Sequence, residues 1–375
     1  MVKKVGILTA GGDCPGLNAV IRGAVKTALY NGVEVYGFLE GYQGLLKNNY
    51  IKLGLNEVSG IIHKGGTILK SNNGTNCFAV PEVNEKGEKV FVDKSEEVAE
   101  MLKKDGFDCL IVVGGDGSLK SGRDFMLRGV NVIGVPKTID NDVPFTDVTF
   151  GYNTAVDVAT EAIDRLRTTA ESHGRIMVLE VMGRYAGWIA LSAAIAGGAD
   201  NCLIPEIPYD LNKVIEKINK RSETGRNYSI IVVAEGAKPK EGSISIREVE
   251  GNAENAGLDS VKLGGAGEYV AKQIEKLTGL TTRSTTLGYI QRGGNTCAYD
   301  RILSTKFGSY AMQLCIEEKF GRMVTVLNGK LQSISLNEVA GTNTTIGAKS
   351  SNLKLVDLNG DLVQSARRIG ICLGD

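Results

Sequence analysis

Short uninterrupted runs of valine, isoleucine and leucine recur along the chain, and each is followed by a glycine-rich turn and a helical stretch. Such runs lie at residues 5–9, 110–113, 176–181 and 229–234. A strand that is buried on both faces carries a continuous apolar run, whereas a strand with one wet face alternates. The pattern therefore predicts an α/β fold with mainly parallel sheets that are doubly wound, with helices on both faces.

The chain is long enough to build two such sheets, each with its own core. Its 375 residues exceed the usual size of one domain. We place a soft boundary near residue 150, because the strands predicted at 176–181 and 229–234 begin a second group. Residues 238–268 are polar and show no period, which predicts a long loop or insertion. The tail after residue 325 contains β-leaning segments that the pattern leaves unassigned.

Composition excludes several classes of function. Lysine plus arginine equals aspartate plus glutamate, at 43 each, so any anion site must be local. No apolar run approaches the length of a signal peptide or a bilayer span. Seven scattered cysteines without CxxC spacing indicate reduced thiols and no structural zinc. We therefore expect a cytoplasmic protein that binds neither nucleic acid nor a membrane.

The first glycine-rich turn, TAGGDCPGLNAVIR at residues 9–22, follows a strand and opens a helix. Glycines let the backbone approach a ligand, and the amide groups at a helix N-terminus attract anions. A plain tight turn between a strand and a helix is an equally good interpretation. The motif matches neither GxGxxG nor GxxxxGKS, so neither of those phosphate-binding mechanisms is indicated.

The second turn, VVGGDGS at residues 112–118, adds a carboxylate to the same arrangement. Asp116 stands between glycines at the end of a strand. Mg²⁺ takes one or two carboxylates together with phosphate oxygens, so Asp116 is well placed to hold it. The alternative is an aspartate that caps the following helix. The double glycine before Asp116 favours the phosphate site.

The third motif, GVPKTIDNDVP at residues 134–144, brings Lys137, Asp140 and Asp142 close together in sequence. Pro136 is expected to end the buried strand before them. Asp140 and Asp142 are two apart, so their side chains share a face in an extended chain. The group offers a base, a cation and a metal ligand, which are the parts that phosphoryl transfer needs. Taken alone, a polar loop with Asx turns would be favoured.

The three motifs, in this order, resemble those of the phosphofructokinase family. The resemblance continues through residues 161–200 and 283–308 and covers most of residues 4–320. It implies two similar doubly wound α/β lobes with the active site in the cleft between them. The implied lobes are a donor lobe for ATP and Mg²⁺ at residues 1–150, completed by about 290–320, and a sugar-phosphate lobe at 151–289 with part of the tail 321–375.

The resemblance also implies a role for single residues. Asp140 resembles the base that takes the proton of the 1-hydroxyl of fructose 6-phosphate, and Thr138 resembles the hydroxyl that steadies the transferring group. Asp116 resembles the residue that serves magnesium, and Arg184 is suited to transition-state charge. The positions that resemble the cradle of the donor phosphates are Gly12, Gly115, Asp116, Gly117 and Ser118. The positions that resemble sugar-phosphate contacts are Thr138, Asp140, Met182, Gly183, Arg184, Glu235, Tyr289 and Arg292.

Two further arginines, Arg175 and Arg283, resemble arginines that reach the sugar phosphate across a subunit interface. They imply a homodimer or a homotetramer, and the planar guanidinium suits a phosphate. Singly, each would more often be a solvated surface charge. Arg22 and Lys26 on the first helix lie where some family members bind effectors, and they are equally well explained as solvated charges, so regulation stays open.

Two positions bear on the phosphoryl donor and point opposite ways. Pyrophosphate users of the family usually carry aspartate in place of Gly117, and they carry lysine at Lys137. We give Gly117 more weight, because an aspartate would repel ATP whereas a lysine adds a donor to phosphate oxygens. The pair resembles ATP users of the mixed-substrate branch, with Lys137 neutralising the transferring phosphate beside Asp140. A second departure is Asn73, where the family usually has arginine; Lys137 or Lys70 is the candidate to compensate.

The function implied by the resemblance is phosphoryl transfer from MgATP to fructose 6-phosphate, giving fructose 1,6-bisphosphate and ADP in glycolysis. The alternatives are a pyrophosphate-dependent fructose 6-phosphate 1-phosphotransferase, a lipid or NAD kinase, and a non-catalytic sugar-phosphate sensor. Lipid and NAD kinases share the GGDG turn but would not be expected to carry PKTIDND and LGYIQRGG together. Asn73 motivates the sensor. The presence of Asp140 argues against it, because a protein that only binds needs no base.

Overall fold

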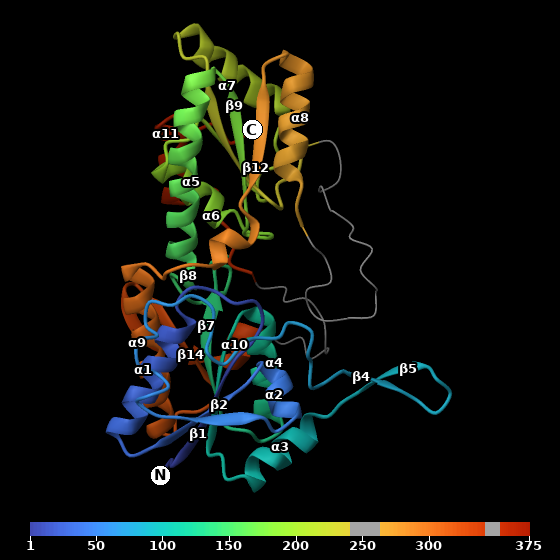
Figure 1. Cartoon of the computed structure of the whole chain (residues 1–375), viewed down its shortest axis with the longest axis vertical. Coiled ribbons are helices and arrows are strands. Elements are labelled where there is room, and N and C mark those ends of the chain that lie inside the picture. Colours follow the sequence, from blue (N-terminus) through green and yellow to red (C-terminus); the bar gives the residue numbers. More distant parts are fainter. Residues whose placement is uncertain (241–262, 342–352) are drawn as a thin grey trace.

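The computed structural model describes residues 1–240, 263–341 and 353–375. Two lobes lie one above the other in Figure 1, and each is built around a sheet. This architecture confirms the predicted α/β fold of two doubly wound lobes. Most of the loop predicted at 238–268 falls at 241–262, which lies outside the described residues.

The first sheet is mainly parallel, with one antiparallel strand at each edge. The strand β8 (Phe150–Gly151) pairs in parallel with the end of β7. In spatial order the strands are β14 (Lys330–Ser335), β13 (Arg322–Leu327), β7 (Val132–Thr138), β6 (Cys109–Gly114), β1 (Lys4–Thr9), β2 (Glu34–Phe38) and β3 (Tyr50–Leu53).

Alternate residues of the first sheet face two separate helical layers. Ile7 packs in the core shared with α1 and α9, whereas the next residue, Leu8, packs in the core on the other face. This alternation explains the continuous apolar runs, because both faces of each inner strand are buried. The helices of the first layer are α1 (Leu17–Tyr30) and α9 (Ala298–Ile316), and those of the second are α2 (Tyr42–Leu46), α3 (Ser95–Lys104), α4 (Asp116–Leu127) and α10 (Leu336–Ala340).

The second sheet has four parallel strands in the order β10 (Asn201–Leu203), β11 (Ser229–Ala234), β9 (Ile176–Val181) and β12 (Thr282–Thr286). Its two faces carry different helices. The core on one face is continuous with that of the first lobe, so the two lobes share buried apolar contact. The helices on that face are α5 (Tyr152–His173), α6 (Trp188–Ala196) and α11 (Asp361–Arg368), and those on the opposite face are α7 (Leu211–Glu223) and α8 (Ala266–Thr278).

The C-terminal part of the chain contributes to both lobes. After α9 the strands β13 and β14 extend the first sheet, because Arg322 of β13 pairs beside Ile133 of β7. Residues from 353 onward return to the second lobe. There α11 packs against α6, and the backbone of Cys372 pairs with that of Asn201 in an isolated parallel β-bridge. Residues 342–352 lie outside the described residues.

Two smaller elements complete the described chain. The strands β4 (Val80–Val83) and β5 (Lys89–Val92) form a hairpin that projects from the first lobe in Figure 1. A short 3₁₀ helix, η1 (Gly288–Arg292), joins the second sheet to α9. Within the ranges that the structure describes, no helix has both the length and the apolar character needed to cross a membrane.

The strand β7 is longer than the sequence predicted. The expectation that Pro136 ends it is wrong, because β7 continues to Thr138. Pro136 pairs with Gly114, the last residue of β6, while Lys137 and Thr138 pair with β8 instead. The residue without an amide hydrogen therefore sits where the strand changes partner, a position at which a proline is tolerated.

Candidate active site

The two glycine-rich turns lie side by side because β1 and β6 are parallel neighbours whose carboxyl ends meet at one edge. The amide of Ala10 donates to the carbonyl of Val113 at 2.9 Å. A Cβ at Gly114 would lie 2.3 Å from Cβ of Ser118, so only glycine fits between the turn and the start of α4. The close approach places the amide-rich start of α4 beside the first turn.

The predicted donor residues Gly115 to Ser118 open a helix. Gly115 precedes α4 without a side-chain cap, and Asp116 is its first residue. The N-terminus of a helix carries partial positive charge, which favours a phosphate. The sequence also allowed Asp116 to be the residue that caps this helix. In the structure Gly115 occupies the N-cap position instead, and Asp116 lies within the helix.

Lys137 reaches from the end of β7 into the first glycine turn. Its ammonium donates to the carbonyl of Gly12 at 2.5 Å, and its side chain is buried. A Cβ at Gly11 would be 3.5 Å from both Nζ of Lys137 and Oγ of Ser118. The ammonium of Lys137 thus lies where the two glycine-rich turns and the end of β7 meet.

Arg292 also lies against the first turn. A Cβ at Gly12 would be 2.1 Å from Nη1 of Arg292, so the guanidinium packs directly against this glycine and would have to move if it were replaced. The Cζ atom of Arg292 is 5.7 Å from the ring centroid of Tyr289, whose side chain is 74% exposed. Arg292, the last residue of η1, therefore packs against the first glycine turn of the first lobe.

Asp140 is buried at the centre of this arrangement. Its pKa is raised by burial, and the positive charges of Arg292, Arg184 and Lys137 oppose that rise. Its Oδ1 atom accepts no hydrogen bond from the part of the chain that the structure describes. The hydroxyl of Thr138 accepts from the amide of Asp140 at 3.0 Å. A buried carboxylate with a vacant acceptor is suited to take a proton from a bound hydroxyl.

The expectation that Asp140 and Asp142 share a face of an extended chain is wrong. Asn141 between them has φ 54°, in the left-handed region, so the chain turns there and strand alternation does not apply. The two carboxyls nevertheless interact. Burial, followed by the charges of Asp140 and Asp116, raises the pKa of Asp142 to about 8.

This set of carboxyls fits Mg²⁺ better than a metal that needs a full protein cage. Over residues 1–240, 263–341 and 353–375 no three His, Cys, Asp or Glu side chains are grouped to enclose a metal. Mg²⁺ needs only one or two carboxylates when phosphate oxygens and water complete its shell. Asp116 and Asp142 are close enough for the charge of Asp116 to raise the pKa of Asp142, and a divalent cation would relieve that repulsion.

The second lobe supplies Met182, Gly183 and Arg184 from the turn after β9, and Glu235 from the end of β11. These strands are parallel neighbours, so the ends adjoin. The amide of Arg184 donates to the carboxylate of Glu235 at 3.1 Å. Gly183 and Arg184 have φ of 138° and 51°, a tight turn in which glycine is favoured. Burial, followed by the charge of Asp140, raises the pKa of Glu235 to about 7.

Two predicted residues lie apart from this group within the single chain. Arg283 is 56% exposed in its side chain and pairs with Glu275 at 3.0 Å. Arg175 precedes β9, at the amino edge of the second sheet, whereas the turn with Arg184 follows the carboxyl end of the same strand. One chain therefore does not bring Arg175 or Arg283 to Asp140.

The sequence interpretation missed two residues that build the site. Gln291 is fully buried, and its Oε1 accepts from the amide of Met182 at 2.8 Å. Its place inside the LGYIQRGG segment was the available signal. Lys354 reaches the loop of Asp140 from the C-terminal tail, and nothing in its sequence surroundings indicates this contact.

The segment around Asn73 borders the first turn. Ser71 donates a hydrogen bond to the carbonyl of Gly11, and the carbonyl of Lys70 accepts from the hydroxyl of Thr9 at 2.9 Å. The side chains of Lys70 and Asn73 are exposed. Of the two cations considered as replacements for an arginine at position 73, Lys137 is the one that lies beside Gly12.

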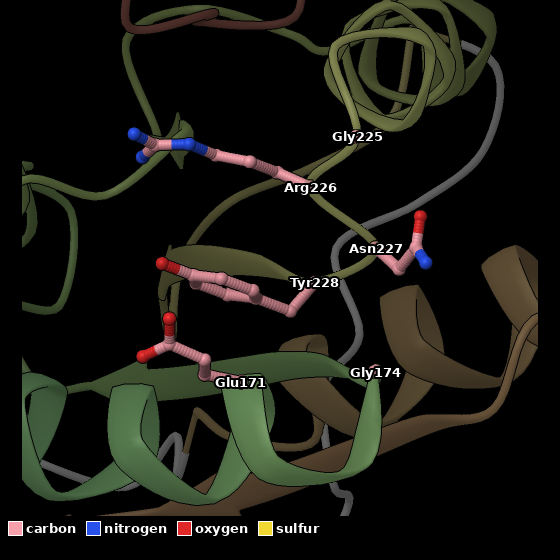
Figure 2. A pocket seen from close by; sticks show the side chains of 6 residues that line it. All are labelled: Glu171, Gly174, Gly225, Arg226, Asn227 and Tyr228. Atoms are coloured by element: carbon pink, nitrogen blue, oxygen red, sulfur yellow. The ribbon is translucent and has the colours of Figure 1, made fainter.

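A separate pocket of about 470 Å³ lies at the amino edge of the second sheet, between the end of α5 and the start of β11. In Figure 2 the carboxylate of Glu171 points toward the ring of Tyr228, whereas Arg226 extends away from them. The strands β9 and β11 begin at this edge and end at the candidate active site, so the pocket is distinct from that site.

A family model described as phosphofructokinase matches residues 4–315 of this chain. The ATP-dependent 6-phosphofructokinase 2 of Clostridium perfringens is 53% identical over 376 residues, covering 100% of this chain and 99% of the relative. The ATP-dependent 6-phosphofructokinase of Spirochaeta thermophila is 44% identical, covering 99% of this chain and 97% of the relative.

Two solved structures have a similar fold. Phosphofructokinase from Saccharomyces cerevisiae is 31% identical with a TM-score of 0.75, covering 90% of this chain and 45% of the yeast chain, so this chain spans less than half of that one. A pyrophosphate-dependent phosphofructokinase from Marinobacter aquaeolei has a TM-score of 0.77 at 22% identity, covering 100% of this chain and 93% of that chain, which is a likeness of fold alone. On these matches, the chain belongs to the phosphofructokinase family.

Proposed function

We propose that this chain transfers the terminal phosphoryl group of ATP to the 1-hydroxyl of fructose 6-phosphate, giving fructose 1,6-bisphosphate and ADP in glycolysis. The observation that carries the proposal is the position of Asp140. This buried carboxyl has a vacant acceptor atom and lies among the charges of Lys137, Arg184 and Arg292, which come from both lobes. The full-length relatives named ATP-dependent 6-phosphofructokinases support the same activity.

In this mechanism Asp140 takes the proton of the 1-hydroxyl as the sugar oxygen attacks the terminal phosphorus of ATP. The bond from that phosphorus to the bridging oxygen breaks, and the electron pair leaves with ADP. Arg184 and Lys137 stabilise charge on the transferring group from opposite lobes, and Thr138 donates a hydrogen bond to one of its oxygens. Positioning and charge neutralisation of this kind supply most of the catalysis in phosphoryl transfer.

The donor phosphates are proposed to bind across the two glycine turns, at Gly12 and at Gly115 to Ser118. Asp116 is proposed to hold Mg²⁺, which neutralises charge on the donor phosphates when bound. Its place in the first turn of α4, near Asp142, supports that role. The rest of the cation's shell would be phosphate oxygens and water.

ATP is the favoured donor because Gly117 adds no charge to the first turn of α4, where an aspartate would repel a nucleotide. The contact of Lys137 with the carbonyl of Gly12 also supports a role beside the donor phosphates. Lys137 is also our candidate to replace the arginine that the family usually has at the position of Asn73. Pyrophosphate as donor is the weaker alternative.

The sugar phosphate is proposed to bind to Met182, Gly183, Arg184 and Glu235, with Tyr289 and Arg292 toward its phosphate end. Arg175 and Arg283 would come from a second copy, because one chain keeps them away from Asp140. We therefore propose a homodimer or homotetramer as the active form. A cytoplasmic location is proposed, in keeping with seven free cysteines.

The test is the initial rate with fructose 6-phosphate and Mg²⁺, with ATP and pyrophosphate in parallel. We expect turnover with ATP and far less with pyrophosphate. Asp140→Asn is expected to lower kcat roughly 10²–10⁴-fold while leaving sugar-phosphate binding measurable by calorimetry. Turnover with pyrophosphate alone would overturn the donor. Tight binding of fructose 6-phosphate without product from either donor would point to a sensor instead.

A further inference from the structure

A short segment of the C-terminal tail, residues 354–356, connects the two lobes at the candidate active site. We call it the tail strap. The amide of Lys354 donates to the carbonyl of Asp142 in the first lobe at 2.8 Å. On the other side, Nε1 of Trp188 donates to the carbonyl of Lys354 at 2.8 Å, and the amide of Val356 donates to Glu206 at 2.9 Å. The strap therefore has hydrogen bonds to both lobes.

The ammonium of Lys354 donates all its hydrogen bonds to the loop that follows β7. It donates to Oδ1 of Asn141 at 2.9 Å and to the carbonyls of Thr146 and Asp147 at 2.9 and 3.0 Å. An ammonium has three protons, so these acceptors satisfy it completely. The same ammonium lies 5.4 Å from the ring centroid of Trp188. Burial lowers the pKa of Lys354 to about 8, and the carboxylates of Asp142 and Asp147 oppose that fall.

The loop needs such a restraint because its backbone is not regular. Asn141 and Phe145 have φ of 54° and 61°, in the left-handed region that residues other than glycine seldom adopt. Within the loop, Oδ1 of Asn141 also accepts from the amide of Thr149 at 3.1 Å. The hydroxyl of Thr149 in turn donates to the carbonyl of Thr138 at 2.8 Å. The hydrogen-bond network thus runs from Lys354 to both sides of Asp140.

The strap also fixes the turn that carries the proposed sugar contacts. Glu206 accepts from the amide of Val356 and, at 2.9 Å, from the amide of Gly187. Gly187 follows the turn of Arg184 and precedes α6. The half-buried carboxylate of Glu206 therefore joins the strap to the second-lobe turn, while Lys354 joins the strap to the first-lobe loop.

We propose that Lys354 is a positioning residue for phosphoryl transfer, holding the loop of Asp140 at a fixed place relative to the Arg184 turn. This inference rests on the proposed function, because it assumes that Asp140 is the base. Without the ammonium, Oδ1 of Asn141 keeps only the amide of Thr149 as a donor, and the carbonyls of Thr146 and Asp147 lose the hydrogen bond from Lys354. The loop then relaxes and the carboxylate of Asp140 spends less time within reach of the 1-hydroxyl.

The test is the steady-state kinetics of Lys354→Met, which keeps the length of the side chain and removes its charge. We expect kcat per folded enzyme to fall about tenfold or more, because the alignment of the base matters most in the transition state. The KM values for ATP and for fructose 6-phosphate are expected to change by less than about threefold, since no substrate contact is removed. Lys354→Arg is expected to recover part of kcat, because it keeps the charge and the donors.

A matched control is Lys330→Met, which removes an exposed lysine of β14 in the same C-terminal region. It should leave kcat and both KM values at the wild-type level. Unfolding by urea is measured for every variant, so that kcat is referred to folded protein. A loss of stability in Lys354→Met with kcat per folded enzyme unchanged would mean a structural role only and would overturn the inference.

Asn141→Gly keeps the inference testable if Lys354→Met does not fold. Glycine tolerates the positive φ at this position and removes only the side-chain acceptor. We expect kcat to fall about threefold or more. Where Lys354→Met folds, the double variant should lose less than the product of the two single losses, because the two substitutions share the contact between Lys354 and Asn141. A wild-type kcat in Asn141→Gly would contradict the inference. Absence of wild-type turnover with fructose 6-phosphate and either donor would instead contradict the proposed function.

Discussion

At the scale of single residues, the candidate site is built from carboxyls that the fold holds in unfavourable surroundings. Burial comes first among the causes that raise the pKa of Asp142 to about 8 and that of Glu235 to about 7. Both groups also feel the negative charge of Asp140. The folded, ligand-free protein therefore takes up protons that the unfolded chain releases at the same pH.

This linkage predicts how the stability of the ligand-free protein depends on pH. Between the usual carboxyl pKa of about 4 and the raised values, the folded state binds more protons, so the free energy of unfolding falls as pH rises. We expect Glu235→Gln to flatten that fall between about pH 5 and pH 7, while the part due to Asp142 continues toward pH 8. Urea unfolding at a series of pH values measures both.

The control for this prediction is Glu100→Gln, which removes an exposed carboxyl of α3. Its pH dependence should follow that of the wild type. If the free energy of unfolding of Glu235→Gln had the same pH dependence as that of the wild type, the protonation of Glu235 would not be linked to folding. That result would contradict the argument that burial raises the pKa of Glu235.

At the scale of elements, the first glycine turn is held in place by the close packing of α1 on α9. A Cβ at Gly308 would lie 2.1 Å from the carbonyl oxygen of Val20, and one at Gly23 would lie 2.7 Å from the carbonyl oxygen of Thr305. The backbones of the two helices therefore touch through glycines. Because α1 begins directly after the first glycine turn, this packing also sets where that turn lies.

Gly308→Ala is expected to destabilise the protein by about 1–3 kcal/mol, because the added methyl group meets main-chain atoms that cannot move without separating the helices. The midpoint of urea unfolding measures the loss. Gly122→Ala is the matched control, since it also lies inside a helix but its Cβ would meet side chains no closer than 3.4 Å. Higher helix propensity should leave that variant neutral or slightly stabilised. Equal midpoints for Gly308→Ala and the wild type would contradict the packing argument.

The inner strands could be predicted from the sequence because burial on both faces gives each of them a continuous run of apolar residues. The runs at 176–181 and 229–234 coincide with β9 and β11. The course of β7 through Pro136 could not be predicted, because it depends on a change of partner from β6 to β8. Partner choice is a long-range property that no window of sequence contains.

The candidate site shows the same division between local and distant information. Asp116 and Asp140 stand in motifs whose residues are neighbours in sequence, so they were named as candidates from the sequence. Lys354 is 213 positions from its partner Asn141, and only the path of the tail brings them together. The left-handed turn at Asn141 was missed for a related reason, since one of the two donors to its side chain, Lys354, comes from that tail.

At the scale of the whole molecule, the two sheets place their carboxyl ends toward one another, and a continuous core runs from one lobe to the other. This arrangement brings the edge proposed to bind the donor phosphates next to the edge proposed to bind the sugar phosphate, with Asp140 between them. It leaves Arg175 and Arg283 at other faces, so a single copy has an incomplete set of the proposed sugar-phosphate contacts. Assembly and substrate affinity should therefore be coupled.

Exposed apolar side chains indicate where a second copy would bind. Tyr289 and Ile290 of η1 are 74% and 65% exposed, and Tyr299 and Ile302 of α9 are 54% and 64% exposed. Tyr299 and Ile302 lie on one face of α9, because residues three apart are neighbours on a helix. Such a concentration of exposed apolar surface beside Arg292 is typical of an interface between subunits.

Ile302→Glu is therefore expected to shift the protein from an oligomer toward the monomer at micromolar concentration, because a charge replaces an apolar contact in the interface. The same variant should raise the KM for fructose 6-phosphate about tenfold or more, since Arg175 and Arg283 of the second copy would be lost. Sedimentation velocity and initial rates measure the two effects. Leu127→Glu, at an exposed apolar position of α4, is the control and should change neither. An Ile302→Glu oligomer with wild-type KM would place the interface elsewhere, whereas a monomer with wild-type KM would mean that one copy completes the site alone.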